Sequence, residues 1–586
     1  MAKSKSGSKT QSIIEILPEE LDDFEREVKK FQAGEWDPKE FMAFRLRQGV
    51  YGQRQPDVQM FRIKAPFGGL TSDQMDALGD VAEKFTPLRK GHLTTRENVQ
   101  FHHIKLTDMP EAMRIIGDVG LSSREACGNT VRNVTGCSLA GVCSDEPFDV
   151  TPYAAAYSRY FVRHPFTQAS PRKFKTAFSG CERDCAITSI HDMGFIPKIV
   201  DGKRGFKVVT GGGTSIMARI APTLYDFVTV DEYLKVTEAV IRIFHSSNEL
   251  RKNRMKARIK FLIDRIGIDD FRDKVDQELK EPWAQRSFDP TALLFVEDEE
   301  KDAPVILDNY HMNGSHTEFT RWIKTNVHSQ KQQGYKAVTI KLPLGDISAE
   351  QFHDLANIAR KYAGGRARIT HQQNLTFRWV PEGALYELWE TLKQIDLNDS
   401  GANEITDVIA CPGTDSCKLG ITSSMGLGRS VSRTLQDMNV QDPLTKKIHV
   451  KMSGCPNGCA QHHIADIGLH GAAMKGSGGQ VPAYEMFLGG SYDDGNTTIA
   501  QRVKTKVPAK KIPDALSRVI ALYQKERHEG EIFREFVLRV GAGRFEDLLA
   551  DFKDVPDLNK ETLGEYMDWD KTVKYMVERG EGECAV

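Results

Sequence analysis

The 586-residue sequence has no long apolar run and no excess of charge of either sign. A membrane-spanning helix needs about 18 or more consecutive apolar residues, and no stretch approaches that length. Lys and Arg number 79 against 81 Asp and Glu, a formal net charge of −2, whereas general binders of nucleic acid or membrane surfaces carry a positive excess. No apolar segment follows the basic start, Met1 to Lys9, as it would in a secretory signal. We therefore expect a cytoplasmic protein with neither nucleic acid nor a membrane as partner.

Cysteines are also few, ten in the chain, which argues against a disulfide framework. Eight of them nevertheless form two quartets of identical spacing: Cys137, Cys143, Cys181 and Cys185, then Cys411, Cys417, Cys455 and Cys459. Each quartet is a C-x5-C pair followed after 37 residues by a C-x3-C pair, and the second quartet is displaced from the first by 274 residues. Agreement at four positions indicates an internal duplication. Cys584, in a polar tail, is expected to be a free thiol.

The duplication extends into the segments that precede each quartet. Residues 63–74 (IKAPFGGLTSDQ) correspond to 340–351 (IKLPLGDISAEQ), and 93–101 (LTTRENVQF) to 369–377 (ITHQQNLTF). Alternating apolar residues around a segment of helical period predict strand, turn, amphipathic helix and strand in each block. Each half is thus expected to hold a small α+β module and a larger module with a cysteine quartet. The proline-containing, acidic stretch 281–305 is expected to link the halves, and the first ten and last few residues are expected to be disordered or frayed.

Four thiolates in two close pairs suit either zinc or an iron–sulfur cluster. Zinc knuckles favour spacings from C-x2-C to C-x4-C, so a C-x5-C pair favours the bulkier cluster. The second quartet also lies in a glycine-containing segment, Ser453-Gly-Cys-Pro-Asn-Gly-Cys459, whose backbone N–H groups can donate hydrogen bonds to cluster sulfurs. We expect a cluster there, and a zinc-stapled binding module is the alternative.

Cys411-x5-Cys417 with Gly454-Cys-Pro-Asn-Gly-Cys459 resembles the signature of the sirohaem, [4Fe–4S] sulfite and nitrite reductases. Further matches run in the family's order through residues 45–545: Arg62-Ile-Lys-Ala-Pro, Leu93-Thr-Thr-Arg-Glu-Asn-Val-Gln, Gly128-Asn-Thr-Val-Arg-Asn-Val, Pro171-Arg-Lys-Phe-Lys and Val209-Thr-Gly-Gly-Gly. The resemblance implies an internally duplicated α+β fold, with two ferredoxin-like half-domains and two larger α/β sirohaem/Fe–S modules related by a pseudo-two-fold axis. The expected boundaries are a tail and helical lead-in (1–44), half-domains (45–115 and 311–397), modules (121–280 and 402–550), a linker (281–310) and a C-terminal tail (551–586).

The same resemblance implies an oxidoreductase that carries out a six-electron reduction at a sirohaem iron, sulfite to sulfide or nitrite to ammonia. Cys411, Cys417, Cys455 and Cys459 would hold the [4Fe–4S] cluster, and Cys459 would be shared with the haem iron. Sulfite is the preferred substrate, because plant-type nitrite reductases generally carry asparagine where Lys175 stands, and nitrite is the alternative. No dinucleotide or flavin fingerprint is evident, so an external ferredoxin or flavoprotein is expected to donate the electrons. A non-catalytic Fe–S redox or sensor protein on the same scaffold is the alternative of another class.

An oxyanion must be held by cations, and its oxygens need proton donors to leave as water. The resemblance assigns substrate binding to Arg62, Arg132, Lys173 and Lys175. It assigns cofactor binding to Arg96, Asn98, Gly211, Gly212, Gly489 and Gly490. Thr339, Gln372 and Thr406, the repeat partners of the three arginines, are uncharged. One catalytic site is therefore expected, built from N-half cations and C-half cysteines.

Well-known members of the family have one cluster and have lost the first quartet, which departs from the sequence here. Unmetallated buried thiols would be easily oxidised, so Cys137, Cys143, Cys181 and Cys185 are expected to hold a second [4Fe–4S] cluster, as a relay or a structural staple. Zinc and free thiols are the alternatives. Cys127 and Tyr51 are both expected near the substrate; a buried apolar role for Cys127 is preferred, and an interaction or cross-link with Tyr51 is the alternative.

Overall fold

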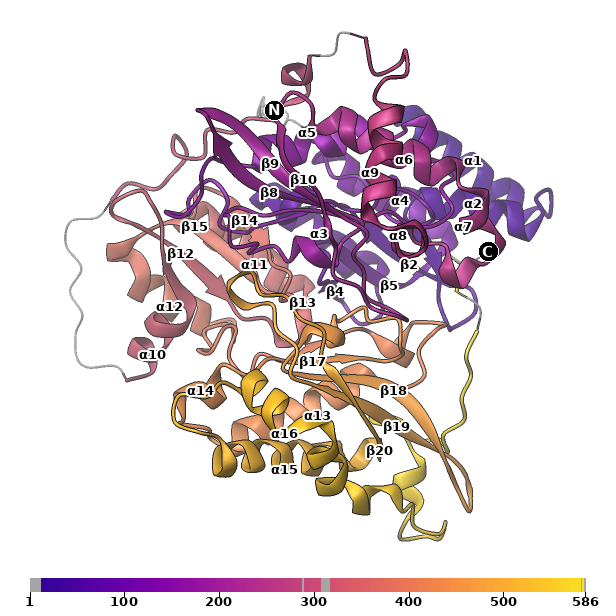
Figure 1. The fold of residues 1–586 in the computed structure, drawn as a ribbon, viewed down its shortest axis with the longest axis vertical. Coiled ribbons are helices and arrows are strands. Elements are labelled where there is room, and N and C mark those ends of the chain that lie inside the picture. The colour runs from indigo at the N-terminus through magenta and orange to yellow at the C-terminus, as the bar shows by residue number, and fades with distance from the viewer. Residues whose placement is uncertain (1–11, 287–288, 307–316, 581, 584–586) are drawn as a thin grey trace, which may run out of the picture.

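The structure, a computed structural model, describes residues 12–286, 289–306, 317–580 and 582–583. Two helices, α1 (Pro18–Gln32) and α2 (Pro38–Arg47), precede the first sheet, and the chain then alternates between small and large α+β units (Figure 1). The expectations for residues 1–10 and for the Cys584 thiol lie outside the described residues, as do parts of the expected linker (287–288 and 307–310) and the start of the expected second half-domain (311–316).

Each small unit is built on a five-stranded sheet, ordered β1-β2-β5-β4-β13 in the first and β11-β12-β15-β14-β3 in the second. The first unit comprises β1 (Val50–Gly52), β2 (Val58–Ile63), β3 (Gly69–Thr71), α3 (Ser72–Phe85), β4 (Lys90–Leu93), β5 (Val99–Lys105) and α4 (Met109–Asp118). The second comprises α10 (Thr317–Asn326), β11 (Val327–Ser329), β12 (Tyr335–Ile340), β13 (Asp346–Ser348), α11 (Ala349–Tyr362), β14 (Arg366–Ile369), β15 (Leu375–Pro381) and α12 (Leu385–Lys393).

The two small units exchange a strand. In the sheet of the first unit, Ile347 of β13 pairs with Gly91 of β4, and in the sheet of the second, Leu70 of β3 pairs with Ala367 of β14. Directly after each exchanged strand a capping box begins the helix, with Thr71 and Gln74 at α3 and Ser348 and Gln351 at α11, because the side chains satisfy the free N–H groups of the first turn. One hydrophobic core runs through both units, so they form a single packed body.

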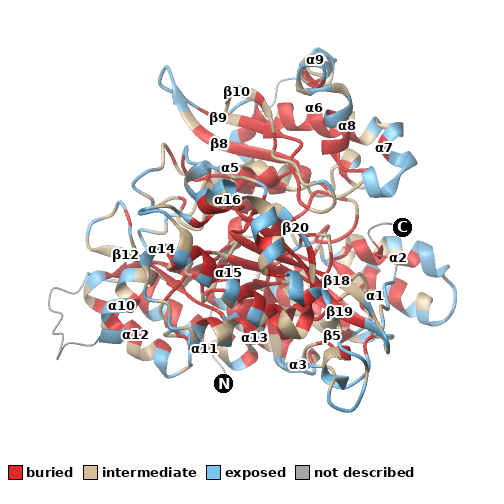
Figure 2. Cartoon of the chain, turned by 60° about the horizontal axis from the view of Figure 1, so that its bottom comes forward, coloured by how far each residue is buried: buried red, intermediate tan, exposed pale blue. Residues whose placement is uncertain are grey.

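The two large units repeat another topology, with three parallel strands followed by two antiparallel ones. The first contains β6 (Thr135–Gly136), α5 (Thr151–Phe161), β7 (Thr176–Phe178), β8 (Met193–Val200), β9 (Lys203–Thr210), β10 (Thr223–Thr229), α6 (Tyr233–Ser246), α7 (Asn248–Lys252), α8 (Ile259–Ile266) and α9 (Ile268–Glu278). The second contains β16 (Ile409–Ala410), α13 (Ser424–Asp437), α14 (Pro443–Lys446), β17 (Val450–Ser453), β18 (Ile467–Gly476), β19 (Gly479–Leu488), β20 (Gln501–Pro508), α15 (Ile512–Glu526) and α16 (Phe533–Leu548). Buried residues fill the sheets and the helix faces against them, whereas the outer faces of α7 and α10 are exposed (Figure 2).

Buried ion pairs anchor two segments, the expected linker and the expected frayed C-terminal end. Glu299, in the expected linker, pairs with Arg368 and Arg378 and accepts a hydrogen bond from the Trp379 indole. Glu583, among the residues expected to be frayed, is 4% exposed and pairs with Arg45 of α2. Neither partner is near in sequence, so composition alone could not reveal the pairs. Among the described residues, no helix is long and apolar enough to cross a membrane.

Candidate active site

The second cysteine quartet converges at the ends of two neighbouring parallel strands. Cys411 directly follows β16, and Cys455 and Cys459 follow β17, with Cys417 in the loop between. The Gly454 N–H donates to the Cys411 Sγ at 3.2 Å, and the Ser424 hydroxyl lies 3.4 Å from the same sulfur. Burial and the neighbouring Cys459 raise the pKa of Cys411 to about 12. Closely grouped, desolvated thiols of this kind become thiolates when a metal binds them.

The first quartet converges in the corresponding place after β6 and β7. The Gly180 N–H donates to the Cys185 Sγ at 3.3 Å, and the Ser179 hydroxyl lies 3.5 Å from it. A hydrogen bond with Cys137 raises the pKa of Cys185, and one with Cys185 raises that of Cys181. The fold therefore brings both sets of four together.

The spacing of the sulfurs tests which metal group these residues fit. Among the eight cysteines, all of which the structure describes, no three sulfurs lie within 4.8 Å of one another. Four thiolates at about 2.3 Å from a zinc ion would be only about 3.8 Å apart. Within the first quartet, however, the Cys185 sulfur is hydrogen-bonded with both Cys137 and Cys181, so the preference for a cluster over zinc rests on the C-x5-C spacing.

Arg62, in β2, and Arg132 both reach the loop that contains Cys127. Nη1 of each guanidinium donates to the Ala126 carbonyl, at 3.3 Å from Arg62 and 3.1 Å from Arg132. Arg62 also donates to the Cys127 Sγ at 3.2 Å, and Arg132 holds the Gly128 carbonyl through Nε and Nη2 at 3.0 and 2.7 Å. The two predicted substrate arginines thus come together, and Arg132 also orders the loop.

Cys127 is fully buried, and Tyr51 packs against the small apolar cluster that Cys127 forms with Leu46 and Met60. The predicted proximity of Tyr51 and Cys127 is compatible with this packing. A covalent link stays an alternative that peptide mass decides, because separate unmodified Tyr51 and Cys127 peptides would exclude it.

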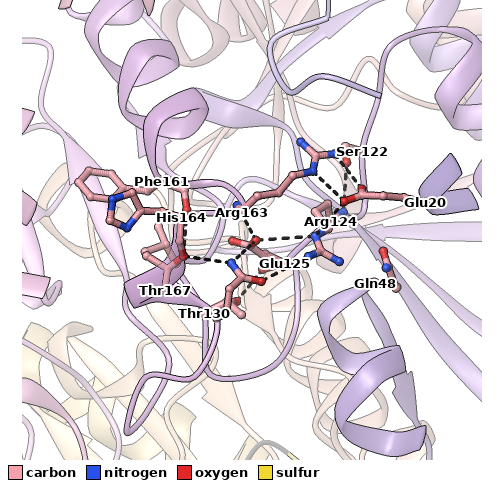
Figure 3. Close-up of polar contacts among 12 residues, drawn as sticks. Glu20, Gln48, Ser122, Arg124, Glu125, Thr130, Phe161, Arg163, His164 and Thr167 are labelled. Atoms are coloured by element: carbon pink, nitrogen blue, oxygen red, sulfur yellow. Dashed lines mark hydrogen bonds and ion pairs between the residues drawn. The ribbon is translucent and has the colours of Figure 1, made fainter. Parts of the chain in front are cut away.

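The buried carboxylate of Glu125 anchors the segment next to this loop (Figure 3). Glu125 is fully buried, and its Oε1 accepts from the Arg163 N–H at 2.7 Å and from the Gln168 amide at 2.8 Å. Its carbonyl accepts from the Thr130 hydroxyl at 3.0 Å, and Arg163 is itself held by Glu20 of α1 at 2.8 Å. A buried charge with these partners has little freedom, so the Cys127–Arg132 loop is fixed.

Lys173 and Lys175 flank Phe174 just before β7 rather than within it. Phe174 forms a parallel bridge with Val131 and packs in the core, which sets the two lysines beside Arg132. Burial lowers the pKa of Lys175 well below its usual value; Arg96, Arg258 and Lys173 act in the same direction, and nearby Cys459 opposes them. The Lys175 amino group therefore lies among N-half cations and within electrostatic reach of the C-half cysteine.

Arg96 sits at the tip of the turn between β4 and β5. The Thr94 hydroxyl accepts from the Arg96 N–H at 3.1 Å and donates to Asn98 Oδ1 at 2.9 Å, so Asn98 holds the turn that presents Arg96. Nη2 of Arg96 meets the His191 ring at 3.1 Å, whereas its buried Nη1 has no hydrogen-bond partner among the described residues. An unpartnered guanidinium nitrogen fits a carboxylate-bearing group such as sirohaem.

The four predicted glycines occupy matching positions in the two large units. Gly211 and Gly489 have φ of +85° and +76°, which favours glycine. A Cβ at Gly212 would lie 2.2 Å from the Ser189 carbonyl oxygen, and one at Gly490 would lie 2.6 Å from that of Ala465. Close backbone packing thus accounts for these glycines within the protein itself.

The two halves meet at Cys459. The Thr95 hydroxyl donates to the Cys459 carbonyl at 2.8 Å, and the Thr214 hydroxyl lies 3.4 Å from that of Gly458. From the other side, Arg54 donates its N–H to the Ser416 carbonyl at 2.9 Å and Nη2 to that of Gly420 at 2.7 Å. The N-half loops that follow β1 and β4 therefore enclose the C-half quartet.

Three residues that shape the site were not singled out from the sequence. Asp192 accepts both Arg258 Nε and Nη2 at 2.7 Å and the Lys175 N–H at 2.8 Å. Lys260 donates to the carbonyls of Thr214, Ile216 and Met217 at 2.9–3.1 Å, which holds the loop against Gly458. Their partners are 17 to 66 residues away, so no local pattern marks them. Only the correspondence of Asp192 with Asp466 at the repeat offset was available as a signal.

Comparison with known proteins finds both kinds of unit twice. The family model for the nitrite and sulphite reductase 4Fe-4S domain matches residues 127–283 and 401–554, and the model for the nitrite/sulfite reductase ferredoxin-like half domain matches 51–119 and 328–395. These matches confirm the predicted duplicated α+β fold.

Individual relatives are similar over most of the chain. The assimilatory ferredoxin-dependent nitrite reductase of Haloferax mediterranei is 29% identical over 92% of both chains. Sulfite reductase [ferredoxin] 1 of Mycolicibacterium paratuberculosis is 30% identical over 82% of both. The solved structure of the Mycobacterium tuberculosis NirA protein superposes with a TM-score of 0.74 at 28% identity, covering 90% of this chain and 95% of that one.

Proposed function

The chain belongs to the nitrite and sulphite reductase 4Fe-4S family, whose models match more than half of it, and is an oxidoreductase of the sulfite/nitrite reductase class; on this basis we propose that it reduces sulfite to sulfide. Cys411, Cys417, Cys455 and Cys459 would hold a [4Fe–4S] cluster, and Arg96 would hold a sirohaem. Sirohaem would supply the substrate-binding iron, and Cys459 would join it to the cluster.

The proximity of Lys175 to Cys459 across the interface between the halves carries this proposal. Lys173 and Lys175 add two amino groups beside Arg62 and Arg132, and an anion bound there favours their protonated form, which suits a doubly charged oxyanion better than a singly charged one. The two arginines are held by the carbonyls of Ala126 and Gly128 and can therefore orient the anion. The lysines can donate protons as its three oxygens leave as water, since six electrons and six protons convert sulfite to sulfide.

The cofactor assignment agrees with the chemistry of the residues present. Arg96 offers the unpartnered guanidinium nitrogen for a sirohaem carboxylate, and the C-x5-C spacing of each quartet favours a cluster over zinc. We assign a second [4Fe–4S] cluster to Cys137, Cys143, Cys181 and Cys185, where it would relay electrons or staple the fold.

The electron donor is proposed to be a ferredoxin. The relatives from Haloferax and Mycolicibacterium are named ferredoxin-dependent enzymes and span the length of this chain. Nitrite remains the second candidate substrate, because the Haloferax relative is named a nitrite reductase and is similar over 92% of both chains.

Steady-state rates on sulfite and nitrite with one artificial reductant test the choice. Wild type should give the higher kcat/KM on sulfite, and Lys175→Asn should shift the ratio toward nitrite by about tenfold, since one charge near the anion is removed. Lys203→Asn, which removes an exposed lysine of the same unit, is the matched control. A ratio that Lys175→Asn leaves unchanged would exclude Lys175 as the discriminating residue, and a higher wild-type kcat/KM on nitrite would favour the second candidate.

A further inference from the structure

The C-terminal segment crosses from the second large unit back to the N-terminal helices (Figure 1). On its way it follows the loop that carries Cys417. Asp568 accepts the Ser423 N–H at 2.7 Å, the Tyr575 hydroxyl donates to the Ile421 carbonyl at 2.9 Å, and the Gly580 N–H donates to that of Lys418 at 3.0 Å. The segment thus lies directly over the loop of the C-half quartet.

At its end, the Glu583 carboxylate is buried where three parts of the chain meet. Arg45 of α2 donates Nη1 and Nη2 to its two oxygens at 2.9 and 2.7 Å. The Gly52 N–H of β1 donates to Oε2 at 2.8 Å, and Lys418 Nζ lies 3.1 Å from Oε1. Charge-assisted bonds of this number and geometry are strong and directional.

Two of the three partners of Glu583, Gly52 and Lys418, directly follow residues near the proposed centre. Gly52 follows Tyr51, which packs against the cluster of Cys127, and Lys418 follows Cys417. Arg45 also donates to the Val50 carbonyl at 3.2 Å, so the ion pair brackets β1 on both sides of Tyr51. One carboxylate therefore links the substrate-side strand with the cluster-side loop.

Gly52 gives independent evidence that this position is built for the carboxylate. A Cβ on Gly52 would lie 2.2 Å from Glu583 Oε1 and 3.0 Å from Arg45 Nη2. Any larger residue would displace the ion pair, because a contact below about 3 Å forces atoms apart.

We propose that Glu583 is a positioning residue that holds β1 and the loop of Cys417 in fixed register across the active centre. It contacts neither substrate nor cofactor and acts through Gly52 and Lys418. The role rests on the proposed placement of the anion beside Arg62 and of the cluster on Cys417.

Two variants test the role, and one control accompanies them. In Glu583→Ala, kcat/KM for the anion should fall about tenfold with an artificial reductant, since small displacements of orienting groups are costly. Gly52→Ala, which keeps the carboxylate but forces it away, should reproduce the loss. Glu578→Gln, which breaks an exposed pair with Arg54 in the same segment, should leave kcat/KM within about twofold.

Hydrogen exchange without substrate gives a readout independent of activity. In Glu583→Ala, the amides of peptides spanning 48–56 and 412–421 should exchange at least about tenfold faster, because their hydrogen-bonded partner is gone, while a peptide spanning β12 should not change. Wild-type exchange together with wild-type kcat/KM would overturn the proposal. So would failure of both Glu583→Ala and the isosteric Glu583→Gln to fold, since the role would then be one of overall stability. If the amides of Glu583→Ala exchange faster but wild type reduces neither sulfite nor nitrite, the proposed function is wrong. The structural role of Glu583 between β1 and the Cys417 loop would still hold.

Discussion

Lys175 in the N-terminal half and His449 in the C-terminal half occupy the same place in the repeat. Each donates its backbone N–H to an aspartate at the same offset, Lys175 to Asp192 at 2.8 Å and His449 to Asp466 at 2.9 Å. Asp192 is then neutralised by Arg258, which frees the lysine side chain to face the centre, whereas Asp466 turns to the His449 ring at 3.2 Å. The backbone geometry is kept while the charge available for an anion is not.

A second pair of equivalent residues, Thr214 and Tyr492, differs in side-chain volume rather than in charge. Thr214 follows Gly211-Gly212-Gly213, and Tyr492 follows Gly489-Gly490-Ser491 at the corresponding position. The Tyr492 ring lies 4.8 Å from that of His449, with Lys451 Nζ 3.9 Å from its centre, and is only 8% exposed. At the equivalent position in the N half stands the smaller Thr214, whose hydroxyl lies beside the Gly458 carbonyl. The duplication thus keeps the same backbone arrangement in both halves. At the positions that correspond to the predicted site, the C half carries one larger side chain and several uncharged ones, which agrees with the prediction of one catalytic site.

The sharpest test of this asymmetry compares two equivalent cysteines. Cys459→Ser should lower activity by at least about a hundredfold, since it removes the thiolate that we propose joins the cluster to the haem iron. Cys185→Ser, its repeat partner, should keep most of the activity with an artificial reductant. Steady-state rates decide, and an active, iron-free Cys459→Ser protein would refute the proposed function as a whole.

A second test of the asymmetry exchanges the side chains at the equivalent positions 214 and 492. Thr214→Tyr should abolish sirohaem absorbance in the purified protein, because a ring of the size of Tyr492 would add volume next to Gly458, the neighbour of Cys459. Tyr492→Thr should not raise the sirohaem content, since that half lacks the arginines. A gain of sirohaem in Tyr492→Thr would show instead that volume alone had closed the second site.

The iron content separates the two quartets. Wild type prepared anaerobically should hold about nine irons per chain, four for each of two clusters and one for sirohaem. Cys181→Ser/Cys185→Ser should lose about four of them and slow turnover with the protein donor by a few fold. Iron analysis with parallel protein quantitation measures this, and about five irons in wild type would exclude the second cluster.

The smallest expected effect on activity concerns Arg368 and Arg378, cations of the C half that pair with the buried Glu299 and stabilise the fold. Burial alone would raise the pKa of Glu299, but Arg378 and Arg368 offset this and hold it at about 2. Because the pKa is lower folded than unfolded, the stabilisation is present at neutral pH and is lost as the pH falls from about 5 toward 2. Glu299→Gln should lower the free energy of unfolding at pH 7 by about 3 kcal/mol, with the difference shrinking in acid.

Denaturant unfolding at pH 7 and pH 3 measures this difference, and kcat should be unchanged. Glu297→Gln, a less buried neighbour that pairs with Arg366 at 3.7 Å, is the control. An equal loss of stability at both pH values would contradict the assigned role of the Glu299 charge.

Much of this arrangement could be predicted from residue spacing. The cysteine offset of 274 gave the duplication, and the loss of charge at Thr339, Gln372 and Thr406 predicted that the halves differ. Thr71 and Ser348 with their glutamines likewise mark the helix starts in the sequence. The exchanged strands could not be predicted, because Gly69–Thr71 and Asp346–Ser348 are too short to carry a periodic pattern. Neither could the roles of Glu299 and Glu583, because burial of an acidic residue depends on arginines distant in sequence.

The exchanged strands have a consequence for how the chain is made. On the ribosome, β3 emerges long before its partner β14, because roughly half of the chain lies between the two strands. At about 5–20 residues per second, the interval is on the order of 15–60 s. During that time the first sheet also lacks β13 and leaves the edge of β4 unpaired, a surface prone to aggregation. Neither half is therefore expected to mature alone, and a newly made N-terminal half should depend on chaperones until the second sheet arrives to complete it.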